Sequence, residues 1–157
     1  MFEINEKVFV KRFGAGVIKN IQEKEFNGII KKYYEINLII SGICICVPFD
    51  EENKIRRIID KKEVQKVFDV LSKTYEKMPY KCIERYKLYK YVLEKGDILE
   101  IAKLIKRFYL TYKHKKISKL DKNSFDELLN LLCSEISLAL CEDYSDVKKK
   151  IYEILNI

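Results

Sequence analysis

Apolar and polar residues alternate with a period of two through the first third of the chain, which predicts β-strands. The predicted strands cover residues 8–10, 17–26, 30–40 and 43–47, and a further short strand is expected over residues 55–59. Asn27-Gly28 is a strong hairpin signal, because a type I′ turn needs positive φ at both central residues. Gly14-Ala15-Gly16 is expected to separate the first strand from the second, so the pattern predicts a small antiparallel β unit.

The alternation also predicts which side chains form the core of this unit. Val17 and Ile21 share one face of the second predicted strand, and Tyr34, Ile36, Leu38 and Ile40 share one face of the third. We expect these apolar faces to pack inward.

The fourth predicted strand is apolar on both faces, so its second face needs a cover. Either the helical part of the chain docks there or a partner does. Cys44 and Cys46 point the same way by strand periodicity. Two thiols without a second cysteine pair or a nearby histidine pair provide too few ligands for a structural zinc site. We therefore expect both cysteines to be small buried hydrophobic residues.

From residue 60 onward apolar residues recur every three or four positions, which predicts helices. The five predicted helices cover about residues 60–73, 81–95, 97–114 and 118–140 and a last segment after residue 145. Asp60 with Glu63, Asp97 with Glu100 and Ser118 with Asp121 give cap signals at three starts, and Gly96 ends the second helix. Cys133 and Cys141 are expected to fill the helical core. The sequence thus predicts an α+β chain with a β domain over residues 1–59 and a compact helical bundle over residues 60–157.

Composition is that of an ordinary globular protein, with 48% hydrophobic and 35% charged residues in 157. The chain has no apolar run of membrane-spanning length, and its first residues are acidic where a signal peptide would be basic. We expect a cytoplasmic protein that does not contact the membrane. The odd number of five cysteines argues against a disulfide framework.

The formal net charge of +7 is concentrated in one segment. Residues 73–116 carry 13 basic and 5 acidic side chains, an excess of +8. This asymmetry favours a polyanionic partner, nucleic acid before membrane, because the segment lacks a long apolar face. On composition alone, a well-solvated lysine-rich helical surface explains it equally well.

The second predicted helix mixes aromatic and basic residues. Its tyrosines are Tyr80, Tyr86, Tyr89 and Tyr91, and they alternate with Lys81, Arg85, Lys87 and Lys90. Such a mixture can hold phosphates and pack against sugars or bases. The alternative is that the rings pack into a helical core with their hydroxyls in water, and we favour it for most of these tyrosines.

Catalytic signatures are absent from the sequence. It contains no P-loop, no dinucleotide-binding fingerprint, no nucleophile elbow and a single histidine, His114. We therefore expect a non-enzymatic binding protein that needs no metal or cofactor. It is either a module with a polyanion site or a protein–protein adaptor whose basic face keeps it soluble.

Several short segments resemble one family over essentially the whole chain, in order. They are Val8-x-Val10, Phe13-Gly14-Ala15-Gly16-Val17-Ile18, Lys31-Lys32-Tyr33-Tyr34, Val47-Pro48, Met78-Pro79 with Arg85-Tyr86, and Lys95-Gly96-Asp97. The sequence resembles the CarD/CdnL family of bacterial transcription regulators. Its N-terminal part is also similar to the RNA-polymerase-interacting domain of transcription-repair coupling factors.

The resemblance implies a Tudor-like β domain that binds the β subunit of RNA polymerase. It also implies a helical domain that contacts promoter DNA, largely independently of sequence, at the upstream edge of the melted region. The implied function is regulation of initiation through open-complex stability, by a monomer without catalytic activity. The implied polymerase contacts are Lys24, Ile45, Cys46 and Val47, and relatives tend to have a basic residue where this chain has Cys46. The alternative is a polymerase-binding adaptor with no functional DNA contact.

On the DNA side, relatives carry a tryptophan that acts as a minor-groove wedge, and this chain has none. Cys82 stands at that place, while Arg85, Tyr86 and Lys87 match the basic-aromatic pattern that follows. The implied DNA-binding residues are Tyr80, Lys81, Cys82, Arg85, Tyr86, Lys87 and Lys90. Tyr80 could supply the missing ring from two residues earlier. Whether the protein activates or represses stays open.

Overall fold

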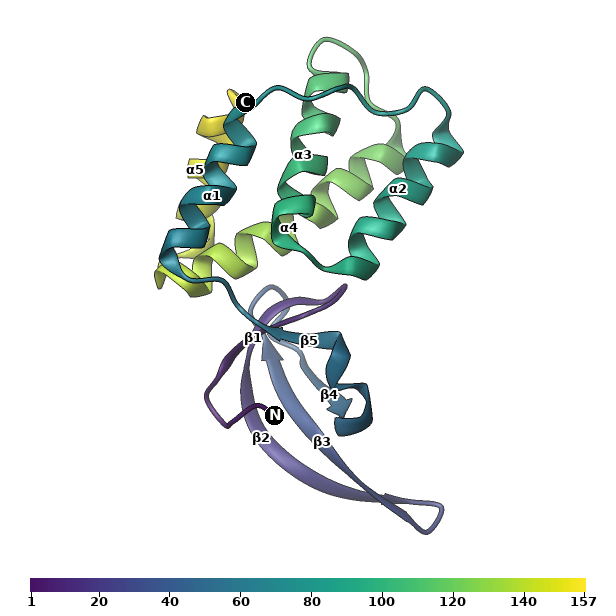
Figure 1. Ribbon diagram of the computed structural model, residues 1–157, viewed down its shortest axis with the longest axis vertical. Helices are drawn as coiled ribbons and strands as arrows, with labels where there is room; N and C mark the ends of the chain where they lie inside the picture. Colours follow the sequence, from purple (N-terminus) through teal and green to yellow (C-terminus); the bar gives the residue numbers. More distant parts are fainter.

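The computed structural model describes residues 1–157 and confirms the predicted α+β class (Figure 1). A five-stranded antiparallel sheet comes first, and five α-helices follow it. The strands are β1 (Lys7–Val10), β2 (Gly14–Phe26), β3 (Ile29–Leu38), β4 (Cys44–Pro48) and β5 (Ile55–Arg57), with a 3₁₀ segment, η1 (Phe49–Lys54), before β5. The helices are α1 (Lys61–Ser72), α2 (Cys82–Lys95), α3 (Ile98–Tyr112), α4 (Lys119–Leu140) and α5 (Tyr144–Leu155).

The strands are ordered β4-β3-β2-β1-β5 across the sheet. The predicted hairpin between β2 and β3 is confirmed, because Asn27 and Gly28 have φ values of 52° and 77°. Both are positive, as a type I′ turn requires. β4 and β5 are the two edges of the sheet.

The segment Gly14-Ala15-Gly16 does not break the chain as predicted. It belongs to β2 and pairs with β1, and the reversal lies in the three residues before it, where Arg12 has a φ of 72°. A Cβ atom on Gly16 would lie 2.4 Å from the carbonyl oxygen of Asn37. This glycine therefore allows the close approach of β3 instead of ending a strand.

The predicted core face of β2 is wrong for a local reason. The pairing of β2 with β3 shifts after Ile18, and Lys19 has no partner residue on β3. Such a bulge inserts one residue and moves the following side chains to the other face. Ile18 and Ile21 therefore share the core face, and Val17 lies on the other face.

The sheet has a small core of its own. It contains Tyr34, Ile36 and Leu38 of β3, as predicted, together with Phe2, Val8, Val10, Ile18, Val47 and Ile55. The prediction is wrong for Ile40, which lies beyond the end of β3 and is exposed. Within this core the ring of Tyr34 stacks on Phe49, with 4.2 Å between the ring centroids. We call the face that bears these residues the inner face of the sheet and the opposite one the outer face.

The helices cover only one end of the outer face. Phe9 and Ala15 lie on this face and belong to the large core that the five helices share. The backbone N–H of Ala15 donates to Ser134 Oγ of α4 at 3.0 Å. Strand β4 lies three strands away from β1, so its outer face stays uncovered and Cys44 and Cys46 are exposed. The prediction that both are buried is therefore wrong.

The helix caps read from the sequence are confirmed. Asp60 and Glu63 form a reciprocal capping box, Asp97 accepts from the N–H groups of Leu99 and Glu100, and Ser118 accepts from Asp121 N–H. Gly96, with a φ of 66°, ends α2 in the left-handed conformation. Helix α5 begins two residues earlier than predicted, because Asp143, not Ser145, is its N-cap.

The two cysteines of the helical part differ. Cys133 is fully buried, as predicted, and burial raises the pKa of its thiol to about 12. Cys141 is exposed, contrary to prediction, because it is the residue after α4 where the chain turns with a φ of 53°. No helix is both long and apolar enough to cross a bilayer.

Candidate functional site

Two of the four predicted polymerase contacts meet on the outer face of the sheet. The ammonium of Lys24 on β2 lies 3.3 Å from the sulfur of Cys46 on β4, and its nitrogen lies 5.7 Å from the centroid of the Tyr33 ring. The hydrogen bond to Cys46 raises the pKa of Lys24. This cluster is open to solvent, because Lys24 and Cys46 are both exposed.

The other two residues point the opposite way. Val47 is buried in the core of the sheet, and Ile45 packs against that core half-buried. Alternation along β4 separates these side chains from Cys46. A partner on the outer face would therefore not touch the side chains of Ile45 and Val47, and its contact with this strand would run through backbone groups.

The outer edge of β4 offers backbone groups for such a contact. Leu38 N–H donates to the carbonyl of Ile43 at 3.0 Å, which makes this a hydrogen-bonded pair. Hydrogen-bonded pairs alternate with non-bonded ones in an antiparallel ladder, so Ile45 and Val47 bond toward β3. The N–H and C=O groups of Cys44 and Cys46 therefore point away from the sheet, free to pair with a strand of another protein.

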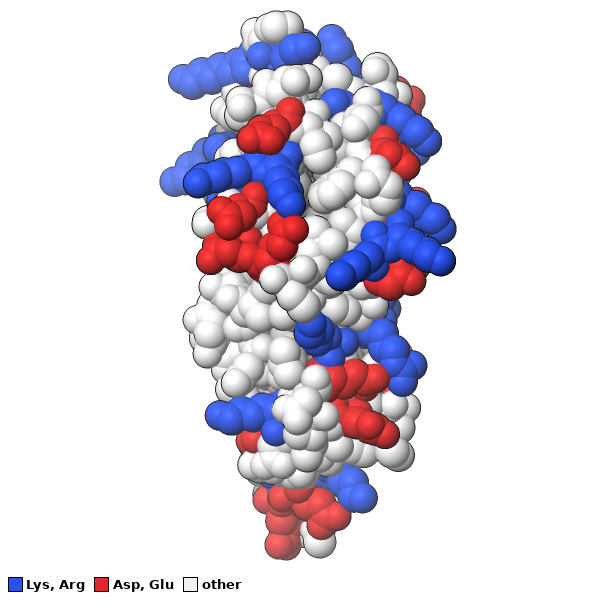
Figure 2. All heavy atoms as spheres, turned by 90° about the vertical axis from the view of Figure 1, so that its left-hand side faces the viewer, with Lys and Arg blue, Asp and Glu red and all other residues white.

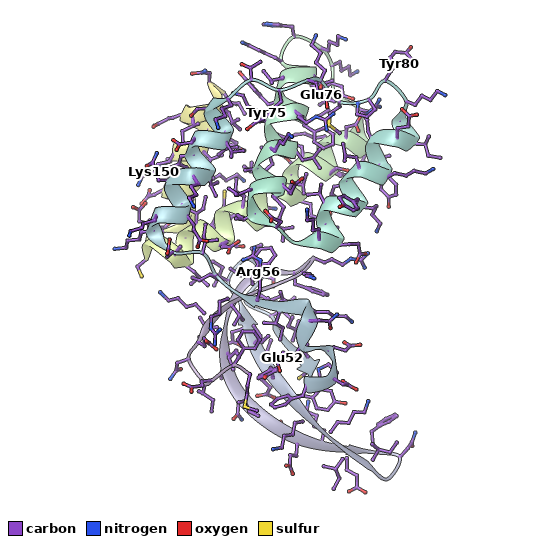
Figure 3. All side chains as sticks on the ribbon, in the orientation of Figure 1. Glu52, Arg56, Tyr75, Glu76, Tyr80 and Lys150 are labelled. Atoms are coloured by element: carbon purple, nitrogen blue, oxygen red, sulfur yellow. The ribbon has the colours of Figure 1, made fainter.

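The predicted DNA-binding residues fall into three groups, and the first lies at the start of α2. Tyr80 directly precedes the helix and is 96% exposed, with its side chain pointing away from the bundle (Figure 3). Lys81 is the N-cap residue and Cys82 the first residue of the helix, and both are exposed. Together they form a protruding corner.

The second group runs along the exposed side of α2. Tyr86, Lys87 and Lys90 follow at helical spacing, and Lys90 Nζ lies 5.8 Å from the centroid of the Tyr86 ring. Tyr89 turns inward, and its hydroxyl donates to Glu127 of α4. Burial and this hydrogen bond raise the pKa of Tyr89. The expectation that most of these tyrosines pack in the core is wrong, because only Tyr89 is buried.

Arg85 alone forms the third group, because its side chain points into the bundle. Its guanidinium pairs with Asp121 of α4 at 3.1 Å and also donates to the carbonyls of Pro79 and Tyr80. Tyr112 of α3 and Ser118 donate to the same carboxylate. Burial disfavours the charge on Asp121, but these donors outweigh it and lower the pKa of the carboxyl. Arg85 holds the loop before α2 in place.

The network around Asp121 brings together chain segments that carry further basic residues, most of which were not predicted from the sequence as DNA contacts. It joins the start of α2 to the end of α3 and the start of α4, so the α3–α4 loop lies at the same end of the bundle as Tyr80 (Figure 1). The exposed lysines at this end are Lys77, Lys81, Lys113, Lys115, Lys116 and Lys119. We call them the basic end. None of the six forms an ion pair.

A sequence signal for the basic end exists. Residues 113–119 contain four lysines and no acid, and this run carries part of the charge excess of residues 73–116. By contrast, the side formed by α1 and α5 shows basic and acidic side chains interspersed (Figure 2). That side offers no surface of one charge sign.

No group of three or more histidine, cysteine, aspartate or glutamate side chains lies close enough to hold a metal ion. A cavity of about 570 Å³ lies at the junction of sheet and helices, and Arg56, Lys66 and Lys95 line it with Glu63 and Asp97. Its charges are mixed, and both acids cap helices. The exposed outer surfaces are therefore better candidates for function than this cavity.

Comparison with known proteins assigns both halves of the chain to one family. Residues 2–59 match the family model described as "CarD-like/TRCF RID domain", and residues 66–152 match the one described as "CarD, C-terminal domain". The chain is also 26% identical over 142 residues to "Putative transcription factor YdeB" of Bacillus subtilis (strain 168), covering 88% of this chain and 92% of that protein. These matches confirm the resemblance seen in the sequence, and the chain belongs to the CarD family of transcription regulators.

Proposed function

We propose that this protein binds the β subunit of RNA polymerase through its β domain, residues 1–59, and promoter DNA through its helical domain, residues 60–157. By holding both, it alters the stability of the open complex at initiation. The observation that carries this proposal is the position of two exposed surfaces on one molecule. The free edge of β4 lies on the sheet, and the basic end lies at the far end of the helical bundle (Figure 1).

Polymerase binding is supported by the chemistry of the β4 edge. Cys44 and Cys46 offer unpaired backbone groups, and such groups bind a partner strand by extending the sheet. Lys24 stands beside this edge and adds a positive charge for an acidic partner surface. The family match of this half to a domain shared with transcription-repair coupling factors agrees with a polymerase partner.

DNA binding is supported by the six lysines of the basic end. They are exposed and without acidic partners, so they are available to phosphates. Lysine contacts to phosphates position a protein on DNA without reading its sequence. We therefore expect binding that depends on salt and only slightly on base sequence.

The two surfaces are held at a fixed separation. Arg56 of β5 donates to both carboxylate oxygens of Glu135 on α4 and to the carbonyl of Gly96 at the α2–α3 turn (Figure 3). The turn between β1 and β2 reaches α2 as well, where Arg12 pairs with Glu94. Because this link is rigid, a protein bound to polymerase through the β4 edge holds its basic end at a fixed position relative to the polymerase.

Arg85 has a positioning role in this proposal. Its contacts to Asp121, Pro79 and Tyr80 use four of its five N–H donors, so at most one remains for a phosphate. We therefore assign the phosphate contacts at the start of α2 to Lys81 and Lys87.

The test uses the full chain and two matched charge reversals. Lys24→Glu should weaken binding to the isolated β subunit at least about tenfold, because it places an acid at the sheet surface. Lys87→Glu should leave β binding unchanged. Its effect on open-complex lifetime, in either direction, should be smaller than that of the wild type. Wild-type binding to β without any effect on open-complex lifetime would favour the adaptor function. Absence of β binding would refute the proposal.

A further inference from the structure

Strand β4 carries two thiols on the uncovered part of the outer face. Cys44 and Cys46 are two residues apart, so the alternation of the strand directs both side chains to the same face. Both thiols are free and exposed. The helices contact this face at Phe9 and Ala15, three and two strands away, and leave the two sulfurs open to solvent. We call Cys44 and Cys46 the dithiol.

A positive charge stands beside the dithiol. The ammonium of Lys24 on β2 lies 3.3 Å from the sulfur of Cys46, and Lys24 forms no ion pair with an acid. A neighbouring lysine favours the thiolate form of a cysteine, and the thiolate is the form that binds metals. The outer face therefore combines two soft ligands with one unpaired cation.

The spacing of the dithiol disfavours a disulfide. Residues i and i+2 of an antiparallel strand are about 6.8 Å apart, and their Cβ atoms leave the strand in the same direction. A disulfide needs its two Cβ atoms at about 3.5 to 4.5 Å. Joining Cys44 to Cys46 would therefore bend β4, whose backbone pairs with β3 through Ile45 and Val47 on both sides of Cys46.

The same spacing suits a metal ion held between the two sulfurs. A metal–thiolate bond of about 2.3 Å puts the sulfurs of a linear site about 4.6 Å apart. Each sulfur then has to lean toward the other by only about 1.1 Å, which rotation about χ1 provides. The strand keeps its pairing, because only the side chains move.

The number of ligands selects the ion. Thiolates favour monovalent copper, zinc and iron–sulfur clusters. Structural zinc sites and iron–sulfur clusters need four protein ligands, and no group of three histidine, cysteine, aspartate or glutamate side chains lies close enough to supply even three. Monovalent copper binds two thiolates in a line. It is therefore the ion that the dithiol can satisfy alone.

Lys24 completes the charge balance of such a site. Binding of Cu(I) to two thiols forms two copper–sulfur bonds, and the two thiol protons pass to water. No electron is transferred. The resulting copper dithiolate carries one negative charge, and the ammonium beside Cys46 carries one positive charge. The complete site is neutral.

We propose that Cys44 and Cys46 form a two-coordinate site for monovalent copper, with Lys24 as its counter-charge. Occupancy of the site changes the surface beside the β4 edge, and this consequence rests on the proposed function. The bound copper dithiolate neutralises Lys24, so an acidic partner surface meets no free cation there. Copper therefore weakens binding of the β subunit.

The test titrates Cu(I) into the reduced full chain in the absence of oxygen, in competition with a chromophoric Cu(I) chelator. X-ray absorption at the copper edge should show two sulfur ligands and no nitrogen or oxygen. Cys44→Ser and Cys46→Ser should each weaken binding more than about a hundredfold, beyond the cost of losing an outer-shell partner. Lys24→Met should weaken it about tenfold, and Lys24→Arg, which keeps the charge, should bind copper as the wild type does.

The matched control is Cys82→Ser with Cys141→Ser. It removes two other exposed thiols, which lie apart at the start of α2 and after the end of α4. This variant should bind copper with wild-type affinity. All substituted side chains are exposed, and far-ultraviolet circular dichroism checks that each variant keeps its fold.

A second measurement compares binding to the purified β subunit with and without Cu(I). Copper should weaken wild-type binding about two- to fivefold, as loss of one exposed charge pair does, and should not affect Cys44→Ser with Cys46→Ser. An equal effect of copper on this double variant would overturn the link between the site and polymerase. Absence of β binding by the metal-free wild type would refute the proposed function while leaving the copper site to the titration.

The titration itself can overturn the site in two ways. Equal loss of copper binding in the control and in the dithiol variants would show that exposed thiols bind copper without a defined site. Tight binding of Zn²⁺ at one ion for two chains, with a dimer in sedimentation experiments, would show a four-thiolate site shared between two copies. Either result would contradict a two-coordinate site within one chain.

Discussion

Arg56 and Glu135 form a two-hydrogen-bond ion pair across the junction of sheet and helices, with N–O distances of 2.5 and 2.8 Å. The carboxylate is fully buried, and it also accepts from the backbone N–H of Ile59 at 3.0 Å. The guanidinium lies 4.2 Å from the centroid of the Phe9 ring. One pair therefore fixes β5, α4 and the linker between the two halves.

We expect Glu135→Gln to destabilise the protein by about 2 to 3 kcal/mol. The substitution keeps the shape of the side chain but leaves the charge of Arg56 half-buried without its counter-charge. Urea unfolding of the full chain measures the change. Glu51→Gln is the control, because it removes the exposed pair with Lys54 and should cost well under about 1 kcal/mol. Equal losses for both variants would mean that the junction pair contributes no special stability.

The contribution of Asp121 to stability should depend on pH. The pKa of its carboxyl in the folded protein lies below the ordinary value of 3.8, so its ionised form is favoured by folding. The stabilisation is fully present above the unfolded pKa and is lost as pH falls through the folded one. The difference in unfolding free energy between wild type and Asp121→Asn should be about 3 kcal/mol at pH 7 and shrink below about pH 4.

The control for this pH dependence is Asp126→Asn. Asp126 pairs with Lys122 on the exposed side of α4, so its removal should cost only about 0.3 to 0.5 kcal/mol. A difference for Asp121→Asn that stays constant from pH 7 to pH 3 would contradict the assignment of its stabilising contacts to the ionised carboxylate.

The basic end should set the salt dependence of DNA binding. Combined alanine substitution of Lys81, Lys115 and Lys116 should reduce the slope of log affinity against log salt by about 2.7, since each phosphate contact contributes about 0.9. The matched control is alanine substitution of Lys61, Lys62 and Lys66, which removes the same charge from exposed positions on α1. Identical slopes for the two triple variants would show that net charge alone governs binding.

The elements of this fold were readable from local patterns because local interactions define them. The Asn27-Gly28 turn, the Asp60 capping box and the end of α2 at Gly96 each depend on residues within four positions of one another. Such signals can be read from the sequence because they do not depend on tertiary contacts. Fold class and the number of helices followed from them.

The failures share a different cause, because each depends on a residue distant in the sequence or on a local irregularity. The bulge at Lys19 leaves the alternation of β2 intact in the sequence but exchanges its faces in the structure. Arg85 was predicted to contact DNA because its neighbours in sequence are basic and aromatic. Its ion-pair partner, Asp121, lies 36 positions later in the chain. Cys46 looks like a core residue because nothing local shows that α4 covers the other end of the sheet.

The start of α2 carries Cys82 in place of a large side chain that could act as a wedge in DNA. An apolar or aromatic side chain inserted at a base step stabilises distorted DNA only if it replaces the lost stacking surface, at a cost of a few kcal/mol for unstacking. The thiol of Cys82 is too small, but it is exposed on the first turn of α2 beside the basic end. Cys82→Trp should therefore lengthen open-complex lifetime on a given promoter.

Tyr80 offers a competing ring, 96% exposed and two residues earlier. Lifetimes should be compared for wild type, Cys82→Trp, Tyr80→Ala and the control Tyr91→Ala, whose ring is exposed on the same helix away from its start. A gain with Cys82→Trp and no loss with Tyr80→Ala indicates that the wedge has been lost. A loss with Tyr80→Ala alone indicates that it has moved to Tyr80. If neither substitution changes the lifetime, or Tyr91→Ala changes it equally, the start of α2 does not meet the edge of the melted DNA.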